Sequence, residues 1–193
     1  MTRQGVILYG PPASGKDTVT AALSGQDDRF ALLPKLKAGT GRSTGYRHVT
    51  PEELDALHHA GRLIVETQRY GNRYAVDRQD VEHMTRAGRI PIIHMGNLAD
   101  VAALRSAVPL EWTAVLLWIP RAVSAERSKH RGDVDTPKRI QAWEDTDAEI
   151  RATGEKPPFD LAIHTDQTEP TDAARRIIRA VELRQSPKAS PDS

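Results

Sequence analysis

The fold of this chain is decided by the stretch Gly10-Pro11-Pro12-Ala13-Ser14-Gly15-Lys16-Asp17-Thr18. The short apolar run Val6-Ile7-Leu8-Tyr9 precedes it and predicts a buried strand, and a helical pattern through Val19, Ala22 and Leu23 follows it. The G-x-x-x-x-G-K pattern needs this order of strand, glycine-bounded turn and helix, because backbone N–H groups and the helix N-terminus then converge on the phosphates of a nucleotide. We interpret the stretch as a phosphate-binding loop.

Within this loop, Lys16 is expected to neutralise the β- and γ-phosphate oxygens of the nucleotide. The residues expected to hold the nucleotide are Gly10, Ala13, Ser14, Gly15, Lys16, Asp17 and Thr18. Asp17 stands where the usual pattern has a Ser or Thr as magnesium ligand, and Thr18 follows it. Two readings of Asp17 stay open: it holds Mg²⁺ directly or through water, or it caps the helix as an acidic residue favoured by the dipole. Asp17 and Thr18 are the candidate metal ligands.

The composition limits the class of protein. At 193 residues, the chain is long enough for one domain with a hydrophobic core and too short for two full-sized domains. Lys plus Arg (27) nearly balance Asp plus Glu (26), so the charge predicts neither a nucleic-acid partner nor an anionic membrane. Cysteine is absent, and no apolar run is long enough to cross a bilayer. We predict a soluble cytoplasmic protein, and the sequence carries no signal of its oligomeric state.

One segment is strongly basic. Residues 29–51 contain no acidic residue, and their cationic or titratable side chains are Arg29, Lys35, Lys37, Arg42, Arg47 and His48. In a chain that is otherwise balanced in charge, this is the place where an anionic ligand would be held. The alternative is a solvated basic loop.

Strands and helices are predicted to alternate along the chain. Further strands are predicted at Phe30–Leu33, Leu63–Thr67, Ile90–Met95, Thr113–Ile119 and Asp160–Thr165. Helices are predicted from Thr50 to Gly61, at about 81–88, 99–107, 121–132 and 138–151, and through Ala174, Ile177, Ile178 and Val181. The run Thr113–Ile119 is the most apolar, which predicts a central strand buried on both faces. Tyr70–Tyr74 reads as a turn with aromatic flanks.

This alternation predicts an α/β fold with an open, mostly parallel sheet that is flanked by helices on both faces. In such folds the ligand lies at the carboxyl ends of the strands. We expect a single domain over residues 1–184. The Ser- and Pro-rich tail 185–193 is expected to be disordered.

The layout resembles the guanylate kinase family over nearly the whole chain. The motifs that carry the resemblance are the loop Gly10–Thr18, Tyr46-Arg47-His48-Val49 before a helix that starts at Thr50, Gly61-Arg62-Leu63-Ile64 followed by Tyr70-Gly71-Asn72-Arg73-Tyr74, a strand bounded by Gly88, and Arg127 with Arg131-Gly132 and Arg139. The resemblance implies a P-loop kinase that uses ATP and Mg²⁺, with a core made of residues 1–33 and 89–184. It also implies an acceptor-binding insertion at about 34–88 and a lid at about 131–139.

The phosphate-handling residues of this family carry over to the chain better than its base-reading residues. Tyr46 and Tyr74 stand at the places of two acceptor-side tyrosines of the family. Lys37 stands at the place of its second acceptor arginine, with Arg42 and Lys35 nearby, whereas Pro34 takes the place of the first arginine.

The residues that read guanine in the family are absent. Its guanine-reading carboxylate aligns with Val65, and Glu66 comes one place later, where a slip of one residue along a strand reverses the face. A hydroxyl of the family aligns with Val76, and its acidic pair aligns with His94 and Gly96. A site without these groups gains nothing from guanine, so we expect an acceptor other than GMP. Ribose 1,5-bisphosphate phosphokinases are similar in their loop and in lacking the acidic pair, so a phosphosugar or an unusual nucleotide is a candidate.

The resemblance also suggests a role for each site residue. The expected catalytic residues are Lys16, Arg127, Arg131 and Arg139. The expected acceptor-binding residues are Lys37, Arg42, Tyr46, Arg47, Glu66, Tyr74 and His94. The alternatives are an exposed ion pair of Arg127 with Glu126, packing roles for the tyrosines, a Glu66 that faces solvent, and a His94 that only satisfies its own hydrogen bonds.

We therefore predict a magnesium- and ATP-dependent small-molecule kinase, which transfers the γ-phosphate of ATP to a small anionic acceptor other than GMP. The alternatives are a ribose 1,5-bisphosphate phosphokinase, a true (d)GMP kinase, and a catalytically silent binding module of guanylate-kinase-like fold. The intact Lys16 and the lid arginines argue against the silent module.

Overall fold

The main sheet of the protein has five parallel strands. The computed structural model describes residues 3–41, 44–69, 71–130 and 136–184. The strands of the main sheet are, in spatial order, β2 (Phe30–Leu32), β7 (Ile90–Met95), β1 (Gln4–Tyr9), β8 (Glu111–Trp118) and β9 (Leu161–His164). All neighbouring pairs are parallel, which confirms the predicted open α/β sheet.

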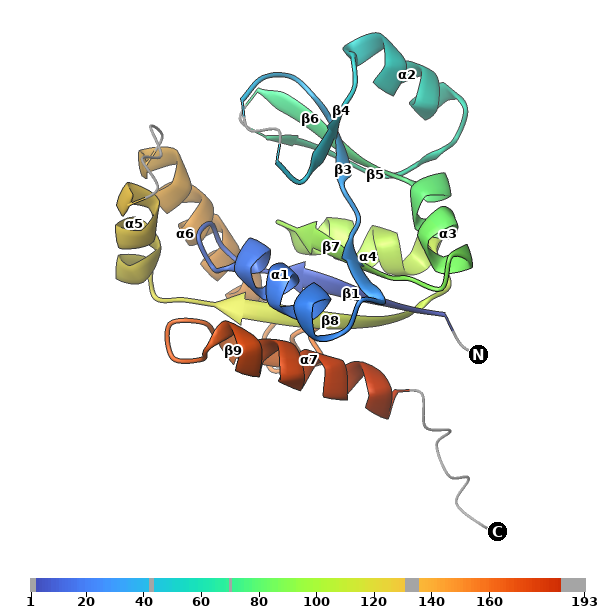
Figure 1. The fold of residues 1–193 in the computed structure, drawn as a ribbon. Helices are drawn as coiled ribbons and strands as arrows, with labels where there is room; N and C mark the ends of the chain where they lie inside the picture. Colours follow the sequence, from blue (N-terminus) through green and yellow to red (C-terminus); the bar gives the residue numbers. More distant parts are fainter. Residues whose placement is uncertain (1–2, 42–43, 70, 131–135, 185–193) are drawn as a thin grey trace.

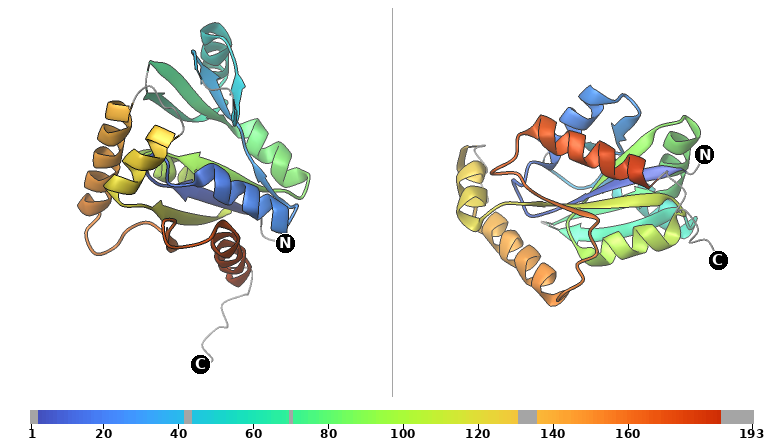
Figure 2. Two further views of the ribbon diagram at one scale, coloured as in Figure 1. Left: turned by 60° about the vertical axis from the view of Figure 1, so that its left-hand side comes forward. Right: turned by 90° about the horizontal axis from the view of Figure 1, so that it is seen from below.

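Helices cover both faces of this sheet (Figure 2). One face packs against α1 (Lys16–Gln26) and α7 (Pro170–Leu183). The other face packs against α3 (Arg78–Arg86), α4 (Leu98–Ala107) and the end of α6. The helices that complete the fold are α2 (Pro51–His59), α5 (Arg121–His130) and α6 (Thr136–Ala152).

The middle strand is β1, and its side chains alternate between the two faces. Val6 and Leu8 belong to the cluster under α1 and α7, whereas Ile7 and Tyr9 belong to the cluster under α4. All four side chains are fully buried, as the continuous apolar run predicts for a strand covered on both faces. The predicted central strand, β8, is an internal strand beside β1 and pairs with β9 on its other edge.

A second sheet lies beyond the first, next to α2 (Figure 1). Its strands are, in order, β4 (Tyr46–His48), β3 (Lys35–Ala38), β6 (Asn72–Asp77) and β5 (Leu63–Arg69). Strand β3 pairs parallel with β4 and antiparallel with β6, and β6 pairs antiparallel with β5. The reading of residues 70–74 as a turn was therefore too wide, because β6 already begins at Asn72.

The ends of two helices follow the sequence signals closely. Thr50 Oγ1 accepts from the Glu53 N–H at 3.1 Å, and Glu53 Oε2 accepts from the Thr50 N–H at 2.7 Å. With Pro51 in the first turn, this is the predicted capping box. Helix α3 begins at the buried Asp77, whose Oδ1 accepts from the Gln79 N–H at 3.0 Å.

Two of the predicted site residues, Arg42 and Arg131, lie outside the described residues, as do the first part of the predicted lid and the tail 185–193. None of the helices within the described ranges combines the length and the apolar character that crossing a lipid bilayer requires.

Candidate active site

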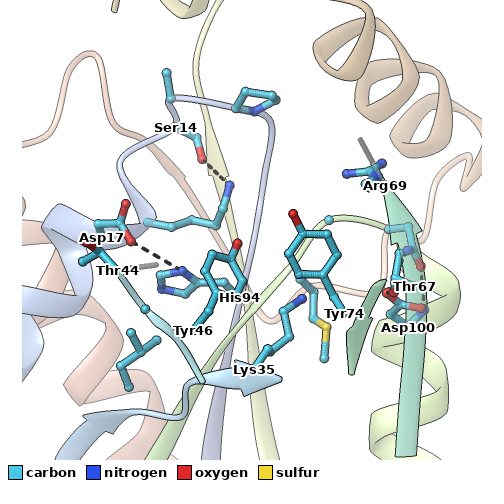
Figure 3. A pocket seen from close by; sticks show the side chains of 18 of the residues that line it. Ser14, Asp17, Lys35, Thr44, Tyr46, Thr67, Arg69, Tyr74, His94 and Asp100 are labelled. Carbon is cyan, nitrogen blue, oxygen red and sulfur yellow. Dashed lines mark hydrogen bonds and ion pairs between the residues drawn. The ribbon is translucent and has the colours of Figure 1, made fainter. Parts of the chain in front are cut away.

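A cavity of about 220 Å³ lies between the phosphate-binding loop and the second sheet (Figure 3). The loop contributes Pro12 to Asp17, and the second sheet contributes side chains of β3, β4, β5 and β6. His94 and Met95, at the end of β7, form part of the wall. The cavity is thus at the carboxyl end of the parallel strands, where the sequence places the ligand.

Two glycines of the loop are required by its geometry. A Cβ on Gly10 would lie 2.2 Å from the carbonyl oxygen of Leu117, so no side chain fits there. Gly15 precedes α1 with a φ of 85°, a left-handed conformation that glycine adopts without strain. The two glycines allow the chain to leave β1, pass close to β8, and turn into α1.

The carbonyl groups of the loop are held by donors of the protein. Lys16 Nζ donates to the carbonyls of Gly10 at 2.8 Å and Pro11 at 3.0 Å. Three side chains from α5 and the end of β9 bind the next three carbonyls. These hydrogen bonds run from Ser124 Oγ to Pro12 O (2.9 Å), from Arg127 Nη1 to Ala13 O (3.3 Å), and from Thr165 Oγ1 to Ser14 O (2.9 Å). Carbonyl oxygens, which would repel a phosphate, are therefore already occupied.

Arg127 is one of these supports, and it is not among the residues that line the cavity. Besides the Ala13 carbonyl, it donates from Nη2 to the Thr165 carbonyl at 2.9 Å. These contacts differ from the predicted role, in which Arg127 closes on the transferring phosphoryl group. They also differ from the alternative, an exposed ion pair of Arg127 with Glu126. The sequence gives no local signal for them, because they join α5 to β9 and to the loop.

Asp17 and His94 meet at the loop end of the cavity. The Nδ1 atom of His94 lies 3.8 Å from Asp17 Oδ1, and its Nε2 atom is hydrogen bonded to Thr20 Oγ1 at 2.8 Å. Both Asp17 and His94 line the cavity. Thr18 is exposed and is not among the lining residues.

Among the described residues, no group of three or more His, Asp or Glu side chains converges on a possible metal position. Mg²⁺ in nucleotide sites needs fewer protein ligands, since it keeps several waters and is held by one or two carboxylates together with substrate phosphates. The carboxylate of Asp17, 45% exposed beside the loop lysine, fits this requirement.

Tyr46 and Tyr74 line the cavity on the side of the second sheet, as predicted. Their rings are 5.3 Å apart at an angle of 51°. Lys37, the third acceptor-side residue predicted there, is buried behind them, with Nζ 5.5 Å from the Tyr46 ring and 5.9 Å from the Tyr74 ring. Burial lowers the pKa of Lys37. Lys37 therefore supports the two rings and is not among the residues that line the cavity.

Two predicted acceptor residues lie away from the cavity. Arg47 pairs with Asp80 at 2.7 Å and with Asp77 at 3.5 Å, at the start of α3. Glu66 Oε1 is hydrogen bonded to His58 Nδ1 at 2.6 Å on the outer face of β5. Successive side chains of a strand point to opposite faces, and this alternation directs Glu66 away from the cavity. Neither residue is brought to the site.

The same alternation brings Thr67 and Arg69 of β5 into the cavity lining. Lys35 of β3 and Asp100 of α4 join them there. Burial lowers the pKa of Lys35 to about 8, and the nearby Arg69 lowers it too, while Asp100 opposes both effects. Lys35 belongs to the basic segment near the predicted acceptor cations, whereas no role was predicted for Thr67, Arg69 or Asp100. The alternation of β5 was the signal that could have indicated Thr67 and Arg69.

Asp100 is held in place by two side chains. Thr67 Oγ1 donates a hydrogen bond to Asp100 Oδ2, and Asn97 Nδ2 donates to the same oxygen at 2.8 Å. Asn97 also caps α4, because its Oδ1 accepts from the Asp100 N–H at 2.7 Å. The Asp100 carboxylate is thus fixed at the start of α4, facing the second sheet (Figure 3).

The positions that align with guanine-reading residues of the guanylate kinase family are apolar and buried. Val65 is 3% exposed and Val76 is fully buried, and both pack in the core cluster that also contains Tyr9. At the third position, a Cβ on Gly96 would lie 2.6 Å from Arg69 Nη1. The space next to Gly96 is therefore taken by the guanidinium of Arg69.

Arg139, on α6, lines the cavity. It is the described member of the predicted lid pair, since Arg131 lies outside the described residues.

Three solved structures with this architecture are described as kinases. Guanylate kinase from Anaplasma phagocytophilum matches with a TM-score of 0.68 and 17% identity over 97% of this chain and 88% of that chain. This chain has the fold of guanylate kinase-like P-loop kinases. A gluconokinase from Sinorhizobium meliloti matches with a TM-score of 0.55 and 17% identity over 95% of this chain and 97% of that chain. A sugar kinase from Janibacter sp. matches with a TM-score of 0.53 and 16% identity over 93% of this chain and 95% of that chain. No protein-family model and no curated protein matches the sequence.

Proposed function

We propose that this protein is a magnesium- and ATP-dependent phosphotransferase that acts on a small anionic acceptor other than GMP. The observation that carries the proposal is a single cavity with two different ends. One end is a complete phosphate-binding loop with Lys16, and the other presents the cations Lys35 and Arg69. Phosphoryl transfer requires mainly that two anionic reactants are positioned and their charge neutralised, which this cavity is equipped to do.

The loop end holds the donor. Lys16 is the cation for the β- and γ-phosphates of ATP, and the hydrogen bonds from Ser124, Arg127 and Thr165 keep the loop in its shape. Arg139 supplies a further positive charge over the transferring group. A binding module without nucleotide chemistry would have no use for this loop with its lysine, which supports an enzyme over the silent module.

Asp17 is the residue that would hold Mg²⁺ at this end, directly or through water. When bound, the ion neutralises phosphate charge that builds up in the transition state. His94 lies beside that carboxylate, with Nδ1 3.8 Å from Asp17 Oδ1, and is itself held by Thr20. Thr18, the other candidate ligand, is exposed outside the cavity lining, which favours Asp17.

The acceptor end supports a ligand other than GMP. Val65 and Val76 are buried and have no polar side-chain atoms with which to bind a base. A base gains affinity only from the groups with which it forms hydrogen bonds. Two of the proteins with this fold are described as a gluconokinase and a sugar kinase, so the fold accommodates polyhydroxylated acceptors. The apolar side chains at Val65 and Val76 favour a phosphosugar kinase, of which ribose 1,5-bisphosphate phosphokinase is one candidate, over a (d)GMP kinase.

The proposal is tested by nucleotide binding and by transfer. We expect ATP with Mg²⁺ to raise the melting temperature of the protein, because a ligand that binds only the folded state stabilises it by mass action. Lys16→Ala should abolish this rise, whereas the exposed Lys156→Ala should keep it. Transfer is then measured with ATP against nucleoside monophosphates and phosphosugars, with products identified by mass. A protein that ATP does not stabilise would be a binding module and not a kinase.

A further inference from the structure

Two cationic side chains of the cavity, Lys35 and Arg69, form no direct ion pair within the described part of the chain, although the carboxylate of Asp100 acts on Lys35 at longer range. Lys35 and Arg69 both line the cavity, and neither forms a hydrogen bond or an ion pair with any described residue. They are close enough for Arg69 to lower the pKa of Lys35. Two nearby cations repel each other, and a charge that is partly withdrawn from water is costly unless an opposite charge balances it. The pair is therefore built for an anion that the ligand supplies.

A carboxylate lies beside these cations. The side chains of Thr67 and Asn97 both donate their hydrogen bonds to the same carboxylate oxygen of Asp100, Oδ2. Within the described residues, Oδ1 accepts no hydrogen bond. A carboxylate repels a phosphate but accepts strongly from a hydroxyl. Asp100 Oδ1 is therefore placed to bind an O–H group of the same ligand whose anion lies at Lys35 and Arg69.

The remaining walls fit a compact, polar molecule. The rings of Tyr46 and Tyr74 form one side, and Lys35 extends between them toward the cavity (Figure 3). Tyrosines offer an apolar ring surface and a hydroxyl that donates and accepts, which suits the C–H and O–H groups of a sugar. The places where the related fold reads a base carry the buried side chains of Val65 and Val76.

We propose that the acceptor is a phosphorylated polyol, a sugar monophosphate whose phosphate lies between Lys35 and Arg69 and whose hydroxyl donates to Asp100. This inference rests on the proposed kinase function, since it names the class of acceptor for the same cavity. It differs from the sequence-based expectation, which placed the acceptor cations at Lys37, Arg42 and Arg47. The phosphate of the acceptor binds through its charge. The hydrogen bond from its hydroxyl to Asp100 selects against acceptors that have no hydroxyl in that position.

The first experiment measures binding of the acceptor class to the full chain in the absence of ATP. Melting temperature and calorimetric titration are recorded with ribose 5-phosphate, glucose 6-phosphate, the unphosphorylated sugars, inorganic phosphate, GMP and AMP. We expect a sugar phosphate to bind more tightly than its free sugar and than inorganic phosphate, and more tightly than either nucleotide. Tighter binding of GMP or AMP, or equal binding of inorganic phosphate and every sugar phosphate, would overturn the inference.

The second experiment assigns the contacts. Lys35→Met and Arg69→Met should each weaken sugar-phosphate binding about 10- to 100-fold, since each removes a charge-assisted contact. Asp100→Asn should weaken the sugar phosphate but leave the weak binding of inorganic phosphate unchanged or stronger. Asp172→Asn, in the first turn of α7 and exposed, is the matched control for an acidic residue at a helix start. Sugar-phosphate binding that survives in both methionine variants would place the ligand elsewhere.

The two proposals fail in different ways. Stabilisation by Mg-ATP is measured for every variant and reports both folding and the donor end. If ATP binds but no sugar phosphate does, the acceptor assignment is wrong and the kinase proposal stands. If a sugar phosphate binds through Lys35 and Arg69 but ATP does not, the acceptor site is right and the kinase proposal is wrong.

Discussion

The hydroxyl of Thr165, directly after β9, donates a hydrogen bond of 2.9 Å to the carbonyl of Ser14 in the phosphate-binding loop. The backbone carbonyl of Thr165 also accepts a hydrogen bond of 2.9 Å from Arg127 Nη2. Thr165 thus connects the far edge of the parallel sheet to the loop and to α5. The conformation of the loop depends on these distant contacts as well as on its own glycines.

Replacing Thr165 by Val tests this connection. The substitution keeps the shape of the side chain and removes the donor to Ser14, so we expect the protein to lose about 1 kcal/mol of stability. The loop should lose part of its fixed geometry, and the KM for ATP should rise about tenfold. Denaturant unfolding and steady-state kinetics measure the two effects. Thr165→Ser, which keeps the hydroxyl, should remain near the wild type, and equal losses in both variants would contradict the role of the hydrogen bond.

Arg127→Met distinguishes a loop-holding residue from a lid residue. The contacts with Ala13 and Thr165 predict that the variant melts at a lower temperature and has a raised KM for ATP. A residue that acts only on the transferring group would leave the melting temperature unchanged and lower kcat by about 10³-fold. The melting curve of the nucleotide-free protein is therefore the deciding measurement. The control is Arg121→Met, also on α5, which removes an exposed ion pair with Glu144 of α6.

Lys35→Met is expected to stabilise the ligand-free protein while it weakens acceptor binding. The pKa of Lys35 lies at about 8, below its ordinary 10.5, because of burial and the nearby Arg69, with Asp100 opposing. The folded state therefore disfavours the charged form, a cost of about 3 kcal/mol that is full below pH 8 and disappears as the pH rises to 10.5. The stability gain of the variant should be largest near pH 7 and shrink above pH 8. A variant that is less stable than the wild type at pH 7 would contradict an unpaired cation.

The pH dependence of acceptor binding follows from the same residue. An anionic ligand favours the charged form of Lys35, so affinity should be full below pH 8 and fall as the pH rises above it. Binding of a sugar phosphate is followed by calorimetry between about pH 6.5 and pH 9.5, roughly 1.5 pH units on each side of the pKa of Lys35. The fall should be absent in Lys35→Met, whose residual binding depends on Arg69, because arginine stays charged throughout this range. An identical fall in the variant would assign the titration to another group.

The loop and the main sheet could be predicted because their signals are local. The glycines around Lys16 and the continuous apolar runs of β1, β7 and β8 identify these elements without knowledge of their partners. The order of the strands in the sheet depends on which strands pair, and local sequence patterns carry no information about that pairing. In the structure, β1 is the middle strand.

The acceptor end was predicted less well because it depends on register and on pairing between distant strands. Strands β3 and β4 lie in the basic segment. In β3 only Leu36 and Ala38 are apolar, and they alternate with Lys35 and Lys37, so the short segment resembles a basic loop more than a strand. On β5, a shift of one residue decides between Glu66, which faces outward, and Thr67, which lines the cavity. The residue types in this region were informative, but which of them face the ligand is set by the pleat of the second sheet.

Asp77→Ala is expected to be among the most destabilising single substitutions at the base of the second sheet. The side chain is fully buried, caps α3, and forms an ion pair with Arg62 as well as a longer one with Arg47. Loss of a helix cap and of a buried ion pair should lower stability by about 3–5 kcal/mol. Asp80→Ala is the control, because it removes the partly exposed partner of Arg47 and should cost about 1 kcal/mol or less. Equal losses in the two variants, measured by denaturant unfolding, would mean that burial of Asp77 adds nothing.

Tyr9→Phe tests a contact that joins the end of β1 to the start of α4 through Glu149 of α6. The Tyr9 hydroxyl, at the end of β1, donates to Glu149 Oε2 at 2.5 Å, and Glu149 Oε1 accepts from the Leu98 N–H at 2.8 Å, at the start of α4. Burial and the adjacent Glu149 raise the pKa of Tyr9, so the wild type should lose stability above pH 10, where an unfolded tyrosine ionises. The Phe variant should be about 1–3 kcal/mol less stable at pH 7, because the carboxylate loses its buried donor, and should lack this alkaline loss. Since α4 carries Asp100, the KM for the acceptor should rise more than the KM for ATP. A variant with unchanged stability and unchanged KM values would show that Glu149 holds α4 without Tyr9.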